Sequence, residues 1–225
     1  MKRTVVIAIP HHGQGCARFW QCLEVLRFYS LAHDIDTIRL TRKGPNLNHN
    51  RNLLVRDTLE KHPDASHLLW IDDDMTFSDD LLVRLLAHEK QIVVANAHRK
   101  QPPYIPVVSV LADDGELVPA YIPPKTGGLH RVSSAGTGVC LTTVDVYDAV
   151  GFPWFETHYS LPIKGARVDP AAMIKGHVLI GGDTQFFMRA GGAGINMYCD
   201  FSLEIGHIGD HEFTWRDYER NQGNN

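Results

Sequence analysis

Three consecutive aspartates are the side chains in this chain best suited to chemistry. Asp72, Asp73 and Asp74 directly follow the apolar segment 68–71, which predicts a buried strand that delivers them to its carboxyl end. Ligands bind at that edge in open α/β sheets. In an extended segment Asp72 and Asp74 would point to one side and Asp73 to the other. Two carboxylates on one side suit Mg²⁺ or Mn²⁺, with a phosphate completing the coordination.

The same triplet could also be a solvated acidic turn that caps the following helix. No Lys or Arg occurs within five residues of it, so three like charges repel one another in sequence. A bound cation would relieve that repulsion. We therefore favour the metal site over the solvated turn.

Two residues late in the chain could complete such a site. His207 stands between glycines at the end of a predicted strand, and an imidazole joined to two carboxylates favours Mn²⁺ over Ca²⁺. It is one of thirteen histidines, so a structural or surface role is the alternative. Asp183 follows two glycines at the start of a predicted helix. It either caps that helix or acts as a general base towards a hydroxyl nucleophile.

Three weaker signals remain. Gly136, Thr137 and Gly138 form a small-residue loop that could admit a ligand near the backbone or could make a turn. Arg51 and Asn52 could bind a diphosphate and a base, or be solvated. His11 and His12, which follow the first predicted strand, are either a pair of ligands or part of a solvated loop. The glycine patterns of dinucleotide-binding and P-loop folds and the nucleophile elbow are absent from the sequence.

The elements that must position these residues alternate between strands and helices in the first half. This pattern predicts an α/β fold with a mainly parallel sheet. Helix 17–31 should bury Phe19, Leu23, Leu26 and Ser30. We expect strands at 4–9, 36–40, 67–71, 91–95, 139–143 and 195–199, and further helices at 51–61, 79–89, 144–150 and 183–190.

The predicted boundaries depend on local signals. Pro10 should close the first strand, Asn50 should cap the helix that follows a polar loop at 43–50, and Ser78 should cap helix 79–89. Helix 183–190 should end at the glycine pair 191–192. Six prolines between 102 and 124 predict a loop-rich, antiparallel second half with a hairpin turn at 114–115.

Length and composition indicate one globular domain. The chain has 225 residues, 44% of them apolar, and a net charge of −4, which argues against sequence-independent binding to a polyanion. No apolar segment is long enough to span a membrane, and four scattered cysteines fit neither a disulfide framework nor a metal motif. We expect a cytoplasmic protein with reduced thiols.

The order of these motifs resembles the GT-A glycosyltransferases, and most closely the small family-2-like enzymes of bacteria and their phages. The resemblance covers residues 4 to about 218. It depends on the aspartate triplet followed, 133 residues beyond Asp74, by a Gly-His-Ile-Gly segment around His207. It implies a nucleotide-sugar-binding half at about 1–100, an acceptor-binding half at about 101–218 and a flexible tail at 219–225.

Residue by residue, the resemblance assigns roles. Asp72 and Asp74 match the DxD aspartates, His207 a late metal ligand, and Asp183 the base of inverting members; the cofactor would be Mn²⁺ or Mg²⁺. Where the family often has Glu-Asp, this chain has Gly182-Asp183, so Asp183 acts alone or the stereochemistry is retaining. The implied nucleotide-sugar contacts are Pro10, His12, Arg51, Asn52, Asp72, Asp73 and Gly138. The implied acceptor contacts are Gly136, Thr137 and Gly182.

The expected reaction is transfer of a sugar, from a UDP-sugar by preference, to an acceptor hydroxyl. The acceptor could be a hydroxymethylated pyrimidine in phage DNA, a glycan or a protein. Residues 99–175 hold equal numbers of basic and acidic residues, so no basic stripe for DNA is visible. A metal-dependent nucleotidyltransferase or phosphohydrolase and a non-catalytic nucleotide-sugar-binding module are the alternatives.

Overall fold

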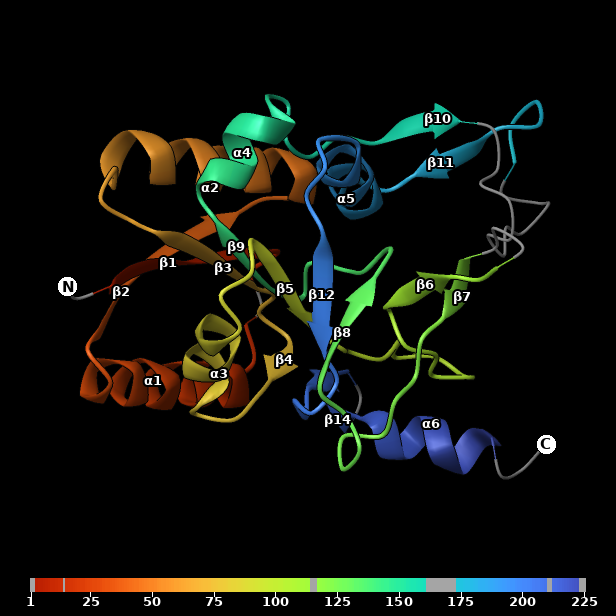
Figure 1. The fold of residues 1–225 in the computed structure, drawn as a ribbon, viewed down its shortest axis with the longest axis horizontal. Helices are drawn as coiled ribbons and strands as arrows, with labels where there is room; N and C mark the ends of the chain where they lie inside the picture. The colour runs from red at the N-terminus through yellow and green to blue at the C-terminus, as the bar shows by residue number, and fades with distance from the viewer. Residues whose placement is uncertain (1–2, 14, 114–116, 161–172, 210–211, 223–225) are drawn as a thin grey trace.

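A seven-stranded, mainly parallel sheet forms the centre of the computed structural model, which describes residues 3–13, 15–113, 117–160, 173–209 and 212–222 (Figure 1). Five strands run in parallel, and β9 and β8 run against them. The predicted α/β class is therefore confirmed. In sheet order the strands are β2 (Ile35–Lys43), β1 (Arg3–His11), β3 (His67–Ile71), β9 (Val139–Thr143), β5 (Ile92–Ala95), β12 (Met197–Asp200) and β8 (Leu129–Val132).

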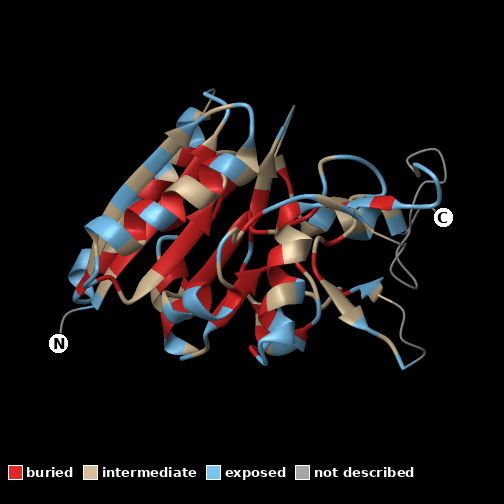
Figure 2. Ribbon diagram, turned by 90° about the horizontal axis from the view of Figure 1, so that it is seen from above, coloured by how far each residue is buried: buried red, intermediate tan, exposed pale blue. Residues whose placement is uncertain are grey.

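Helices cover both faces of the sheet, so its inner strands are buried from both sides, whereas the edge strands β2 and β8 are partly exposed (Figures 1 and 2). Side chains of β1 alternate between the two faces: Val5 and Ile7 lie in one buried cluster, and Val6 and Ala8 lie in the other. Helices α1 (Ala17–Ala32) and α3 (Leu81–Ala87) contribute to the first cluster. Helices α2 (Leu47–Lys61), α4 (Asp145–Val150) and α5 (Gly182–Gly192) contribute to the second.

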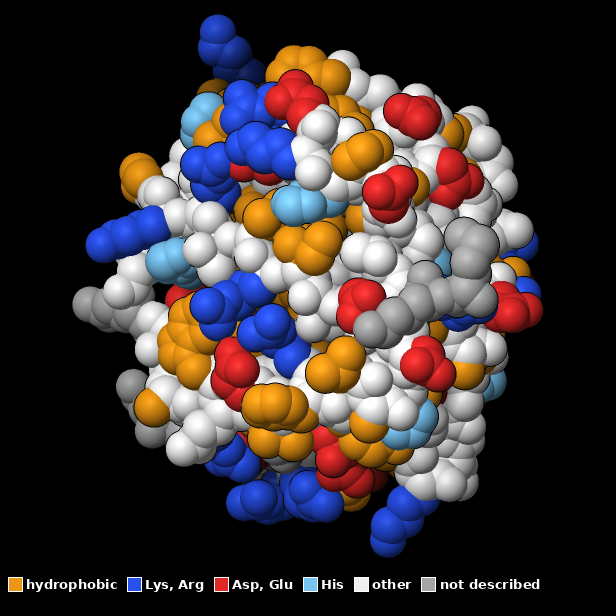
Figure 3. Space-filling view, turned by 90° about the vertical axis from the view of Figure 1, so that its left-hand side faces the viewer, with side chains coloured by type: hydrophobic (Ala, Val, Ile, Leu, Met, Phe, Trp, Pro, Cys, Tyr) orange, Lys and Arg blue, Asp and Glu red, His pale blue; other side chains and the backbone are white. Residues whose placement is uncertain are grey.

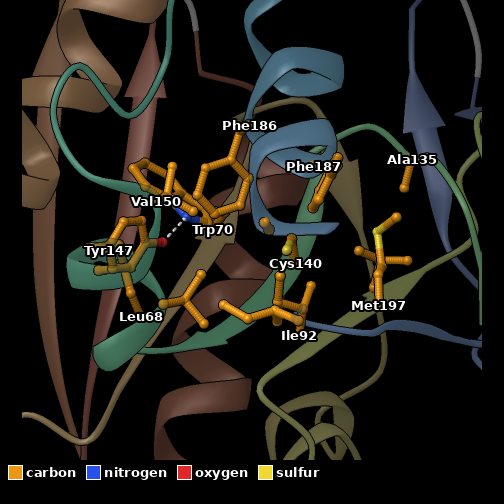
Figure 4. Close-up of a cluster of buried hydrophobic side chains, with 14 of the residues drawn as sticks. Leu68, Trp70, Ile92, Ala135, Cys140, Tyr147, Val150, Phe186, Phe187 and Met197 are labelled. Carbon is orange, nitrogen blue, oxygen red and sulfur yellow. Dashed lines mark hydrogen bonds between the residues drawn. The ribbon is translucent and has the colours of Figure 1, made fainter. Parts of the chain in front are cut away.

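One hydrogen bond ties the helical layer to the strand that carries the triplet. Trp70 of β3 is fully buried, and its indole N–H donates to the hydroxyl of Tyr147 in α4 at 2.7 Å (Figure 4). The ring of Phe155 packs edge-on against Trp70 and is stacked on Phe186 of α5. The end of β3 is thereby fixed against two helices.

Most predicted elements are present, and the boundaries differ for identifiable reasons. Helix α1 buries the four residues expected of it. Helix α2 begins four residues earlier than predicted, because Asn46 caps it by accepting from the His49 N–H at 3.0 Å. Asn50 is buried inside that helix and donates to the Gly44 carbonyl, so the predicted cap was wrong.

Three further boundaries were also wrong. The parallel pairing of β1 with β2 continues through Pro10 to His11, beyond the last contact with β3 at Ala8. Asp80, not Ser78, precedes α3, and no side chain caps that helix. Helix α5 includes both glycines of the 191–192 pair.

The second half of the chain adds small antiparallel sheets and a last helix, as Figure 1 shows. The predicted turn at 114–115 lies outside the described residues, but the strands on either side pair in antiparallel fashion. Residues 219–222, predicted as part of a flexible tail, belong to α6, and the rest of that predicted tail, 223–225, lies outside the described residues. These elements of the second half are β6 (Ser109–Leu111), β7 (Leu117–Pro119), β10 (His158–Ser160), β11 (Val178–Ile180), β13 (Gly206–Ile208), β14 (Glu212–Phe213) and α6 (Trp215–Gln222). Strand β4 (Met75–Thr76), from the first half, joins the small sheet of β13 and β14.

Two expectations about the whole chain can be compared with the structure. None of the helices in the described ranges is both long and apolar enough to cross a membrane. All four cysteines are free; Cys140 and Cys199 are buried, and burial raises the pKa of both thiols above its usual value.

Candidate functional site

The aspartate triplet forms a turn at the carboxyl end of β3. The backbone N–H of Asp72 donates to the Gly138 carbonyl at 3.0 Å, and the N–H of Met75 donates to the Asp72 carbonyl at 3.2 Å. The segment is therefore not extended, and the expected alternation of side chains was wrong. Asp72 and Asp74 instead meet different partners.

Arg51 joins Asp72 to Asp183, which lies far away in sequence. Its Nη1 lies 2.5 Å from Oδ1 of Asp183, and its Nη2 lies 3.3 Å from Oδ1 of Asp72. The arginine side chain is 5% exposed, whereas each carboxylate is 27% exposed. The solvated alternative for Arg51 was wrong. A ligand can reach the two carboxylates more readily than the guanidinium between them.

Asp183 lies in the first turn of α5, but it does not cap that helix with its side chain. Its second carboxylate oxygen accepts the backbone N–H of Thr137 at 3.1 Å. The carboxylate is thus fixed from two directions, by Arg51 of α2 and by the loop before β9. Asp183 is therefore not a simple helix cap, because its carboxylate binds Arg51 and the Thr137 N–H and not the first N–H groups of α5.

Asp74 belongs to a second cluster on the other side of the triplet. Oδ2 of Asp74 lies 2.5 Å from Nζ of Lys100 and 3.5 Å from Nε2 of His207. Strand β13 holds His207 beside β4, where His207 pairs with Met75, and the Ile208 N–H donates to the Asp74 carbonyl at 2.6 Å. Backbone pairing therefore brings the late histidine to the triplet.

The middle aspartate, Asp73, lies near the two histidines at the end of β1, His11 and His12. Burial and the charge of Asp74 raise the pKa of Asp73, and the nearby His11 and His12 oppose that shift. His12 is exposed, and Pro10 lies in the last part of β1. These residues line the same edge of the sheet as the triplet.

The pKa values of the two outer aspartates move in opposite directions. Burial raises the pKa of Asp72, with a contribution from the charges of Asp183 and Asp74, although Arg51 opposes it. Burial also acts to raise the pKa of Asp74, but His207 and Lys100 outweigh it and hold that pKa below its usual value. For Arg51 itself, burial opposes the charge, yet Asp183 and Asp72 outweigh it and raise its pKa.

The predicted glycines permit close approaches around these clusters. A Cβ on Gly138 would lie 2.5 Å from Cε of Met75, and one on Gly182 would overlap the side chain of Asn48. Gly136 has room for a Cβ, whose nearest neighbour would be Val107 at 3.8 Å. Gly138 and Gly182 thus allow the loop and α5 to pack tightly beside the triplet.

Asn52 is engaged away from these clusters. Its amide N–H donates to the Phe155 carbonyl at 2.7 Å, and its amide oxygen accepts the Phe155 N–H at 3.1 Å. This reciprocal pair anchors the loop after α4 to α2. The contact uses one of the two amide N–H groups and one lone pair of the oxygen, so a base or sugar would meet only the remaining ones.

Asp74 and His207 together present donor atoms that fit a divalent cation. Nδ1 of His207 lies 2.8 Å from the His98 carbonyl oxygen, which can only accept, so Nε2 of the neutral ring keeps its lone pair. Oδ1 of Asp74 is buried without a hydrogen-bond partner. Asp72 is paired with Arg51, and no group of three or more His, Cys, Asp or Glu side chains in the described ranges is placed to hold a metal. Two protein donors suit a Mg²⁺ or Mn²⁺ that takes its remaining ligands from phosphates and water.

Two features of the site had no clear signal in the sequence. Lys100, the cation nearest to Asp74, lies in an irregular segment after β5 without any motif. The burial of Arg51 also could not be read locally, because the polar sequence around it resembles a loop. Proximity to the carboxyl end of β5 was the only pointer to Lys100.

Comparison with known proteins gives a likeness of fold. No protein-family model and no curated protein matches the sequence. The structure is similar to that of A197 from STIV, with a TM-score of 0.53 and 18% identity over 94% of this chain and 88% of that one.

Two weaker structural likenesses have TM-scores of 0.37. One is to a glycosyltransferase involved in the glycosylation of the major capsid of PBCV-1, at 14% identity over 67% of this chain and 69% of that one. The other is to 4-diphosphocytidyl-2C-methyl-D-erythritol synthase from Anaerococcus prevotii DSM 20548, at 9% identity over 66% and 75% of the two chains. At 18% identity, what this chain shares with A197 is the fold, here a mixed α/β domain around a mainly parallel sheet.

Proposed function

We propose that this chain is a metal-dependent glycosyltransferase that moves a sugar from a nucleotide sugar, by preference a UDP-sugar, to an acceptor hydroxyl. One observation carries the proposal. Four residues that the sequence singled out separately, Asp72, Asp74, Asp183 and His207, gather at the carboxyl edge of one sheet in two adjoining clusters. That edge is where α/β sheets bind their ligands.

In this proposal Asp183 is the general base. Its carboxylate is partly exposed and is held by Arg51 and by the Thr137 N–H. A carboxylate held in this way can accept the proton of an acceptor hydroxyl as that hydroxyl attacks the sugar carbon. Arg51 acts as a positioning residue, because its buried guanidinium fixes Asp183 relative to Asp72.

Asp74 and His207 would hold the divalent cation, Mn²⁺ or Mg²⁺. When bound, the cation would stabilise the negative charge that develops on the leaving diphosphate. Asp73, His12 and the backbone at Gly138 border the same edge and are the proposed contacts of the nucleotide sugar. The cation, the nucleotide-sugar donor and a cytoplasmic site of action are parts of the proposal.

For the acceptor, we favour a glycan over DNA. On the molecular face at the β2 edge, basic side chains lie among acidic ones (Figure 3). Arg39 pairs with Glu24, whereas Arg42, Arg56 and Lys61 share the single carboxylate of Asp57. The edge that carries the proposed catalytic residues has three aspartates, Asp72, Asp74 and Asp183, for two cations, Arg51 and Lys100, and such an acidic edge repels a phosphate backbone.

The test is a product assay with single-residue variants. The purified chain is incubated with a set of UDP-sugars, Mn²⁺ and candidate acceptors, and the release of UDP and the glycosylated product are both measured. Asp183→Asn should lower transfer by about 100-fold or more, and Asp74→Asn should abolish the stimulation by Mn²⁺. Asp79→Asn, an exposed neighbour on the same segment, is the matched control.

The same assay separates the alternatives. Release of pyrophosphate or phosphate from a nucleoside triphosphate would indicate a nucleotidyltransferase or phosphohydrolase. Saturable UDP-sugar binding without turnover would indicate a binding module. Turnover by Asp74→Asn at the wild-type rate would refute the proposed site.

A further inference from the structure

A small pocket lined by polar groups without partners lies beside the Asp74–His207 pair. Asn96 and His98, which are 6% and 2% exposed, contribute buried polar side chains, and the partly exposed Tyr121 and Trp215 line it as well. We call it the Asn96–His98 pocket. Its volume is about 10 Å³, which is room for one group of the size of a water molecule.

Four buried polar atoms of this pocket have no hydrogen-bond partner. They are Oδ1 of Asn96, both ring nitrogens of His98 and Nε1 of Trp215. The amide oxygen accepts, the indole N–H donates, and a neutral imidazole does one of each. A buried polar atom that lacks a partner destabilises the fold. A ligand that both donates and accepts hydrogen bonds would remove part of that cost.

The pocket belongs to the same edge of the sheet as the proposed catalytic residues. Asn96 directly follows β5, and β5 runs parallel to β3, because both are antiparallel to β9. The backbone carbonyl of His98 accepts from Nδ1 of His207 at 2.8 Å. A molecule in the pocket would therefore lie next to the donor site.

We propose that the Asn96–His98 pocket binds one hydroxyl group of a sugar acceptor, an assignment that rests on the proposed function. A hydroxyl is the size of a water molecule and can both donate and accept. The ring of Tyr121 offers apolar surface to the rest of a sugar, while the Arg216 guanidinium lies over the Trp215 ring, 4.6 Å from its centroid. No Lys or Arg is among the described residues that line the pocket itself.

The first test follows the Trp215 indole N–H by NMR while methyl hexosides are added to the full chain. We expect a saturable shift of this signal, which is assigned with Trp215→Phe. The indoles of Trp70 and Trp154 are internal controls, because each already donates to Tyr147, and they should not move. No shift of the Trp215 signal with any methyl hexoside would overturn the proposal.

The second test replaces the unpaired groups with apolar ones of similar shape. Asn96→Leu and His98→Phe should leave the melting temperature unchanged or raise it, because they remove unsatisfied polar atoms. They should weaken the affinity for methyl hexosides, measured from the shift of the Trp215 signal, by about tenfold or more. A fall in melting temperature would mean that these polar groups stabilise the fold. An unchanged affinity for methyl hexosides would mean that these groups do not bind the sugar. Either result would overturn the proposal.

A third measurement separates this inference from the proposed function. UDP and Mn²⁺ binding by wild type and Asn96→Leu is measured calorimetrically. If UDP does not bind to wild type but methyl hexosides still shift Trp215, the glycosyltransferase proposal fails and the sugar site stands. If a hydroxymethylcytosine oligonucleotide shifts Trp215 and methyl hexosides do not, the sugar site is overturned and the acceptor is DNA.

Discussion

Replacement of Arg51 by Met removes the cation that pairs with both Asp72 and Asp183. The resulting loss in the free energy of unfolding can be derived from these contacts. The guanidinium is 5% exposed and pairs with Asp183 and Asp72 at 2.5 and 3.3 Å. Removal of one partner from a buried ion pair costs about 3–5 kcal/mol. Because each carboxylate is 27% exposed and water compensates in part, we expect about 3 kcal/mol. For a chain of this length that lowers the melting temperature by roughly 6–12 °C.

The penalty of Arg51→Met should depend on pH with a definite sign. Burial already raises the pKa of Asp72 against the opposing effect of Arg51, so loss of the arginine raises that pKa further. A carboxyl group with a raised folded-state pKa destabilises the fold at higher pH, and this penalty disappears once the group is protonated in both states. The stability difference from wild type should therefore be largest near pH 7–8 and should shrink as the pH approaches 4.

Urea unfolding at several pH values measures this difference. Arg56→Met is the matched control, since Arg56 lies on the same helix but is 47% exposed, and it should cost less than about 1 kcal/mol. Arg51→Met combined with Asp183→Asn should recover part of the loss at pH 7. The reasoning is refuted if Arg51→Met costs no more than the control, or if its cost is the same at pH 4 and pH 8.

Three other perturbations address packing, acid stability and the metal pair. Gly138→Ala places a Cβ 2.5 Å from Cε of Met75, but that methyl is the end of a flexible side chain that can turn aside, so the variant should cost less than about 1 kcal/mol in thermal or urea unfolding; a larger loss would mean that Met75 cannot move. Burial acts to raise the pKa of Asp57, but three cationic side chains of β2 and α2 outweigh it and hold that pKa far below its usual value. Its stabilising effect is thus present above about pH 4 and lost below it, so Asp57→Asn should flatten the acid limb of the stability curve; a parallel acid limb would exclude this role. Lys100→Met should raise the affinity for Mn²⁺ alone about tenfold by calorimetry, because the ammonium group competes for the same carboxylate; unchanged affinity would mean that the lysine does not compete.

Local patterns in the sequence were sufficient to predict the elements in which buried apolar residues recur at regular spacing. Helix α1 shows this, because Phe19, Leu23 and Leu26 recur at helical spacing and all are buried. The start of α2 was not readable in the same way. Its first residues are polar and resemble a loop, and Asn46 and Asn50 are equally good caps by residue type, so only the hydrogen bond to His49 distinguishes them.

The candidate site was predictable as a set of residues but not as a set of contacts. The triplet, Asp183 and His207 each had a recognisable sequence context. Their partners did not, because Arg51 is 132 residues from Asp183 and Lys100 is 26 residues from Asp74. Contacts over such separations depend on which strands adjoin in the sheet, and a single sequence contains no signal for that order.

The charges of the site determine how a metal and a diphosphate could enter it. Arg51 is shared by two aspartates, and Lys100 neutralises Asp74, so the site is already acidic before a ligand binds. A diphosphate without a cation would add negative charge to this acidic edge. A divalent cation without a diphosphate would have to displace Lys100 and, among the residues that the structure describes, would find only Asp74 and His207 as protein ligands. Each ligand therefore supplies what the other lacks, and by linkage each must raise the affinity for the other by the same factor.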